Sequence, residues 1–166
     1  MGVIPFPLTN RGVRHPTFPV IEVSRLSLDE AADWQANVMA ECRRRRVPTS
    51  SLADWLETRG LLLRCTVLSS DGPGEPLRIP GQALIPALNG EREPGAIHHP
   101  GATDPHLLAQ TIGVQCAENV SAGEAVLNRI LVSGIGCPFV HTHAFYGWED
   151  KGRRRVLSAV DIQTLH

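Results

Sequence analysis

Two histidines separated by a single residue, His141 and His143, are the side chains of this chain best suited to do chemistry. They lie in a run of apolar and aromatic residues, CPFVHTHAFY, which covers residues 137–146. Such a run is typical of a β-strand, in which residues two apart point to the same face. We therefore predict that Phe139, His141, His143 and Phe145 share one face and form the wall of a binding pocket.

An imidazole changes its protonation state near neutral pH, so it can donate or accept a proton in a reaction. We assign that role to His143, with His141 assisting or orienting it. A His-x-His pair on a strand can also supply two metal ligands on one face, so a metal site is an alternative. A structural role, as hydrogen-bonded residues of the core, also stays open. Candidate third metal ligands are His98, His99, His106, Cys137 and Glu149.

Arg64 is the second residue that the sequence singles out. It lies in the run 61–69, which is otherwise apolar on both faces except for Thr66, so we predict a central strand. A guanidinium buried there needs a partner, because it cannot escape desolvation by losing its proton. That partner is either a structural carboxylate or the carboxylate of a ligand. Further candidate ligand contacts are Arg129, Phe139, Thr142 and Phe145.

The histidine-bearing run is the middle one of three β-rich segments near the C-terminus. Residues 127–133 precede it and residues 154–162 follow it. Gly134 and Gly136 mark the first connection, and the polar run WEDKGR at 148–153 marks the second. Turn residues between β-rich runs are typical of hairpins, so we predict a three-stranded antiparallel meander.

Helices are predicted in the first half of the chain. Ser27 and Glu30 fit a capping box, and apolar residues then recur at helical spacing, which predicts a helix over 28–46. Ser51 can cap a second, short helix that Gly60 ends. The remaining predictions are strands over 20–24 and 77–85, a loop over 86–104 and a helix over 105–117.

The bulk composition is that of an ordinary globular protein. A length of 166 residues suits one domain, and 42% hydrophobic residues are enough for a core. Residues 1–20 hold four prolines, so we expect an extended N-terminal arm there. We expect residues 21–166 to form a single α+β domain, with one mainly antiparallel sheet and helices packed on it.

Charge and hydropathy argue against several classes of protein. A net charge of -1 disfavours a nucleic-acid-binding protein. No apolar run reaches the length of a membrane span, so we expect a soluble, cytoplasmic protein. The four cysteines are widely spaced, and we expect free thiols, with disulfides as the alternative. Without a Gly-rich phosphate loop or a Cys-x-x-Cys pair, we expect no cofactor. The oligomeric state stays open.

Three stretches resemble chorismate pyruvate-lyase and the related sensor domains of bacterial winged-helix regulators. The first is a predicted strand that contains an arginine and is followed by a turn. The second is a predicted strand that ends in a proline, and the third is the predicted strand that contains the two histidines. The three stretches are LLLRCTVL at 61–68 with the turn at 71–76, GQALIP at 81–86, and GCPFVHTHAF at 136–145.

This resemblance implies a chorismate-lyase-like fold over about residues 26–162 and a cofactor-free reaction. It also implies that Arg64 holds a substrate carboxylate. The family's catalytic glutamate corresponds to His143 here, which departs from the pattern. An imidazole can still exchange a proton near neutral pH, but the departure also fits a domain that only binds its ligand.

Three functions follow from these observations. The first is a cofactor-free, lyase-like enzyme that acts on a small, cyclic, carboxylated metabolite, with Arg64 as anchor and His143 as acid or base. The second is a non-catalytic small-molecule sensor that uses the same pocket. The third is a metal-dependent enzyme that uses His141 and His143 as ligands.

Overall fold

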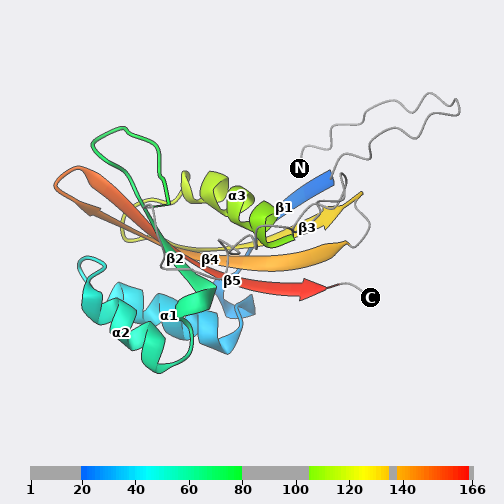
Figure 1. Ribbon diagram of the computed structural model, residues 1–166, viewed down its shortest axis with the longest axis horizontal. Coiled ribbons are helices and arrows are strands. Elements are labelled where there is room, and N and C mark those ends of the chain that lie inside the picture. Colours follow the sequence, from blue (N-terminus) through cyan, green and yellow to red (C-terminus); the bar gives the residue numbers. More distant parts are fainter. Residues whose placement is uncertain (1–19, 80–104, 135–137, 165–166) are drawn as a thin grey trace, which may run out of the picture.

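The computed structural model describes residues 20–79, 105–134 and 138–164. Within them, five antiparallel strands form one sheet in the order β1-β3-β4-β5-β2. Figure 1 shows α1 and α2 on one face of this sheet and α3 on the other. The elements are β1 (Val20–Leu26), α1 (Asp33–Arg43), α2 (Ser50–Thr58), β2 (Cys65–Ser69), α3 (Pro105–Ala117), β3 (Ala125–Ser133), β4 (Phe139–Asp150) and β5 (Arg153–Thr164).

The predicted α+β class and the antiparallel meander are confirmed. Strands β3, β4 and β5 are hydrogen-bonded neighbours in that order. The second turn is shorter than predicted, because Lys151 and Gly152 both adopt positive φ (51° and 76°) and make a two-residue connection. Trp148 therefore lies in β4, where it is buried, and its indole Nε1 donates a hydrogen bond to the Arg45 carbonyl oxygen at 2.9 Å.

The strand predicted over 61–69 begins later than predicted, at Cys65. Residues Leu62–Arg64 form a 3-10 turn, and β2 pairs with β5 on one side and, through the bridge between Ser69 and Arg78, with the start of the returning segment on the other. The sequence of β2 is apolar on both faces because both faces are covered. Cys65 packs in the cluster beneath α1 and α2, and Leu68 packs in a cluster with Ala117 of α3. Coverage by helices on both sides accounts for this apolar pattern.

The first helix also differs from its prediction over 28–46. The Ser27–Glu30 capping box is present, but it caps a single 3-10 turn over Leu28–Glu30. Ala31 and Ala32 are then extended, both with ψ 146°, and α1 begins only at Asp33. This break lets Leu28 and α1 pack against the same core cluster.

The second helix begins earlier than predicted. Thr49 is its N-cap, and the Ser51 hydroxyl accepts a hydrogen bond from Arg45 at 2.6 Å instead of capping the helix. Gly60, with φ 66°, follows the end of the helix as predicted. Leu52 and Leu56 face the core and are 2% exposed.

Several predictions concern residues that the structure does not describe, or describes only in part. The arm up to residue 19, the loop over 86–104 and most of the returning strand over 77–85 are outside the described residues. The start of that strand is seen as a bridge between Arg78 and Ser69. No helix in the described ranges is long and apolar enough to cross a membrane. The free cysteines that the structure describes are Cys42, Cys65 and Cys116.

Candidate functional site

The predicted face of β4 is present as a row of four buried rings. Phe139 and the rings of His141, His143 and Phe145 are each 2% exposed or less. Successive ring centroids lie 5.4, 4.6 and 5.4 Å apart. We call these four residues the ring row. They share one face because β4 is a regular strand that pairs with β3 and β5 on its two sides.

Helix α3 covers the ring row. Gly113 lies directly over His143, since a Cβ atom built on this glycine would be 2.6 Å from Cε1 of His143. Beside the contact is a cavity of about 20 Å³, lined by residues that include Gly113, His143, Thr66 and Ser158. A cavity of this size has room for roughly one water molecule.

The histidine nitrogen atoms are unusually short of partners. Nδ1 of His143 lies 3.4 Å from the Ser158 hydroxyl. Nε2 of His143 and both ring nitrogens of His141 are buried and have no hydrogen-bond partner within the described ranges. An unpaired buried polar group costs about 1–3 kcal/mol. Native proteins keep such groups where water, an ion, a ligand or catalysis uses them.

Both imidazoles are held in the neutral state. Burial lowers the pKa of His141 to about 4. Burial also lowers the pKa of His143 well below its usual value, and the neighbouring His141 lowers it further. At neutral pH each ring therefore offers one N–H donor and one nitrogen acceptor. Uncharged rings of this kind suit a ligand that exchanges hydrogen bonds, and they do not attract an anion.

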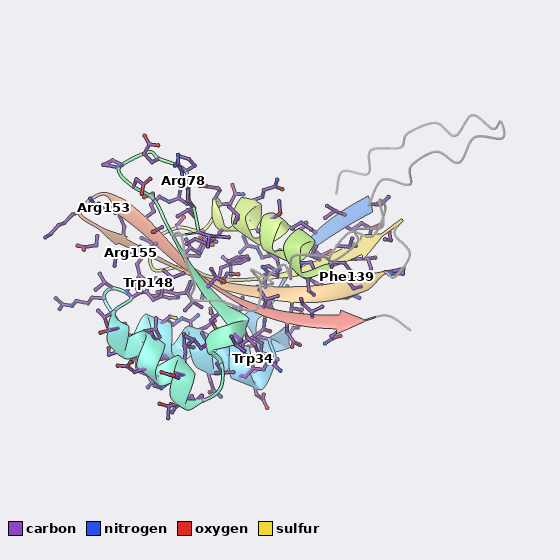
Figure 2. The ribbon with its side chains drawn as sticks, in the orientation of Figure 1. Trp34, Arg78, Phe139, Trp148, Arg153 and Arg155 are labelled. Atoms are coloured by element: carbon purple, nitrogen blue, oxygen red, sulfur yellow. The ribbon has the colours of Figure 1, made fainter. Side chains whose placement is uncertain are left out.

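Arg64 does not lie at the ring row. Its side chain is 53% exposed and lies 3.6 Å from the carboxylate of Asp161. Its guanidinium is also 5.3 Å from the ring of Trp34, in the helical layer seen in Figure 2. Asp161 is paired with Thr142, so it points to the α1 side of the sheet, opposite to His143. The expectation of a buried Arg64 is wrong, and a structural carboxylate is its partner.

Arg129 and Thr142 also lie away from the histidines. They are cross-strand partners on the α1 side, where Arg129 is exposed. The Thr142 hydroxyl donates to Oε1 of Gln35 at 3.2 Å. The four rings of the ring row thus lie together on the α3 side of the sheet. The three other candidate residues, Arg64, Arg129 and Thr142, lie on the α1 side.

For the alternative of a metal site, the described residues provide no complete set of ligands. No cluster of three or more histidine, cysteine, aspartate or glutamate side chains occurs in those ranges. Glu149 is exposed near the hairpin. The other proposed third ligands are His98, His99 and Cys137, which are outside the description, and His106, whose side chain is not described.

Sequence reasoning missed three residues of the site. Ser158 contacts His143 from β5, Asn128 faces His143 from β3 and is 7% exposed, and Gly113 allows the close approach of α3. A signal existed for Ser158, since it is the single hydroxyl residue in the apolar run VLSAV at 156–160. The register that places Asn128 opposite His143 has no such signal in the sequence.

Comparison with protein-family models, with curated proteins and with solved structures finds no match to this chain. The resemblance to chorismate pyruvate-lyase therefore stays a prediction, and function has to be inferred from the residues themselves.

Proposed function

We propose that this protein binds a small molecule between α3 and the sheet, at the ring row. The observation that carries the proposal is the set of three buried ring nitrogens on His141 and His143 without described partners. A ligand with hydrogen-bonding groups would satisfy them and remove their desolvation cost. Phe139 and Phe145 flank the imidazoles and would contact the apolar part of the ligand.

For such a ligand to enter, α3 would have to move away from β4. A cavity of about 20 Å³ holds little more than one water molecule. Gly113 touches His143 closely, so a larger molecule can enter only where the helix moves away from β4. The nearby polar groups, Thr66, Asn128 and Ser158, are uncharged. These surroundings favour an uncharged polar ligand, or one whose charge stays outside.

A cofactor-free, lyase-like enzyme is the second candidate. It is favoured by the contact between the Ser158 hydroxyl and Nδ1 of His143, which would orient the ring and leave Nε2 free for a proton. Arg64 lies across the sheet, so a substrate carboxylate would need another anchor.

The experiment is a thermal-shift screen of small polar aromatic compounds, such as phenol and benzamide, against the parent protein. Compounds that bind only the folded state raise the melting temperature. We expect such shifts to disappear in His143→Leu and to persist in Arg64→Ala, which serves as the matched control. Shifts that survive His143→Leu would place binding elsewhere. Pyruvate release from chorismate, lost in His143→Leu, would support the lyase; binding without release would leave a binding protein.

A further inference from the structure

A second cavity lies on the other side of the sheet, between α2 and β2. Its volume is about 360 Å³, and it is open to solvent along one side. Ligand sites in proteins span about 300–1,000 Å³ and combine an apolar lining with a few polar groups. We call it the α2–β2 groove. It shares no lining residue with the cavity at His143.

The floor of the α2–β2 groove is aliphatic. Leu52 and Leu56 come from the inner face of α2, and Val67 comes from β2. Ala53 adds a methyl group from α2. No aromatic ring and no acidic side chain is among the described residues that line the groove. Such a surface favours a flexible or branched hydrocarbon chain.

A cationic side chain, that of Arg155, lines the groove. Arg155 lies there on β5, opposite Ser69 of β2, toward the hairpin end of the strand (Figure 2). Its NH1 donates to the Pro48 carbonyl oxygen at 3.4 Å, which is a long contact. Within the described ranges no ion pair is found for Arg155, whereas its neighbour Arg154 pairs with Glu118 at 3.0 Å.

A half-buried guanidinium with unused donors beside an aliphatic floor has a clear chemical complement. A carboxylate accepts two parallel N–H bonds from arginine, and an attached hydrocarbon chain would cover the leucines and the valine. A single arginine matches one negative charge. We propose that the α2–β2 groove binds a small aliphatic monocarboxylate, with its carboxylate paired to Arg155 and the Ser69 hydroxyl beside it.

The test titrates hexanoate into the full chain and follows backbone amide resonances by NMR. Hexanamide has the same chain without the charge, and hexylammonium reverses the charge. Arg155→Gln removes the cation but keeps much of the side chain, and Ala53→Phe fills the groove without changing any charge. Arg153→Gln is the matched control, because it removes an arginine from the same strand that does not line the groove. His143→Leu separates this site from the ring row.

We expect hexanoate to shift resonances of α2 and β2, and hexanamide and hexylammonium to bind at least about tenfold more weakly. Loss of one charged hydrogen-bonding partner accounts for about that factor. Arg155→Gln and Ala53→Phe should weaken hexanoate binding to the same degree, and Arg153→Gln and His143→Leu should leave it unchanged. Equal binding of hexanoate and hexanamide, unchanged binding in Arg155→Gln, or no shifts in α2 and β2 up to the solubility limit would overturn the proposal.

Discussion

Gly113 of α3 and His143 of β4 are so close that a Cβ atom on the glycine would lie 2.6 Å from Cε1 of the imidazole. Real Cβ atoms do not approach another atom this closely, so the position admits only glycine unless the helix or the ring moves. Glycine inside a helix costs about 1 kcal/mol relative to alanine. The close seating of α3 on His143 therefore explains why a helix-breaking residue is found at this place.

Gly113→Ala should destabilise the protein despite its better helix propensity. Overpacking costs about 1–3 kcal/mol, which outweighs a gain of about 1 kcal/mol from the alanine. Urea unfolding would show a net loss of up to about 2 kcal/mol. Gln115→Ala, on the exposed side of the same helix, is the control and should change stability by less than about 0.5 kcal/mol.

The same substitution in a His143→Ala background tests the contact itself. Without the imidazole, the added methyl group has space, and Gly113→Ala should become neutral or stabilising. A coupling energy near zero in this double-mutant cycle would mean that the helix does not rest on the ring as described.

The stability of the protein should fall as the pH is lowered from about 6.5 towards 4. The unfolded chain binds protons at His141 and His143 with a pKa near 6.5, whereas burial lowers both values in the folded state, to about 4 for His141. Because the unfolded state binds more protons in this window, the folded state is fully stable above it and loses stability progressively as the pH falls through it. The slope is about 1.4 kcal/mol per pH unit for each histidine.

Urea unfolding at several pH values measures this slope. The double variant His141→Leu/His143→Leu keeps every carboxylate, so subtracting its profile from that of the parent isolates the two imidazoles. A parent and a double variant with parallel profiles between pH 6.5 and about 4 would show that the buried rings are protonated in the folded protein, contrary to the lowered pKa values.

Arg64→Ala should have little effect on stability. The Arg64–Asp161 pair is separated by 3.6 Å and its arginine is 53% exposed, and exposed pairs contribute about 0–1 kcal/mol. The contact with Trp34 at 5.3 Å adds at most about 0.5–1 kcal/mol. Arg59→Ala, which removes a guanidinium 4.2 Å from the Trp55 ring, is a matched comparison. A loss of several kcal/mol on chemical unfolding would mean that Arg64 contributes more to stability than its exposed contacts with Asp161 and Trp34 explain.

The local part of the fold was predictable, and the pairing of distant segments was not. Alternation along β4 correctly placed Phe139, His141, His143 and Phe145 on one face, because the side-chain period of a strand is local. The start of β2 at Cys65 was missed, because the apolar run that begins at Leu61 does not separate the 3-10 turn over Leu62–Arg64 from the strand that follows it. Arg64 was assigned to the wrong environment for that reason.

Only the part of the site that lies on a single strand, β4, was predictable from the sequence. His141 and His143 lie together because they are two residues apart, but Ser158 and Gly113 reach them through the register of β5 and the placement of α3. These depend on contacts between residues far apart in sequence. The apolar pattern of the first helix held a usable signal at Gln35, which occupies a core position between Ala31 and Val38 at helical spacing.

Gln35→Leu should destabilise the protein strongly, because this buried amide joins α1 to two strands. Its Nε2 donates to the carbonyl oxygens of Thr142 in β4 at 3.1 Å and Ala159 in β5 at 2.9 Å. Its Oε1 accepts from the Thr142 hydroxyl at 3.2 Å and from the amide of Ala32 at 3.4 Å. Leucine fits the volume but leaves these groups without their partner.

An unpaired buried polar group costs about 1–3 kcal/mol, and more than one is created here, so we expect a loss of about 2–4 kcal/mol in urea unfolding. Asn37→Leu on the exposed side of α1 is the control and should change stability by less than about 0.5 kcal/mol. Hydrogen exchange should also quicken at the amides of β4 and β5 near Thr142 and Ala159, since α1 would no longer be tied to them. A Gln35→Leu protein as stable as the parent would mean that hydrophobic contact alone holds α1 on the sheet.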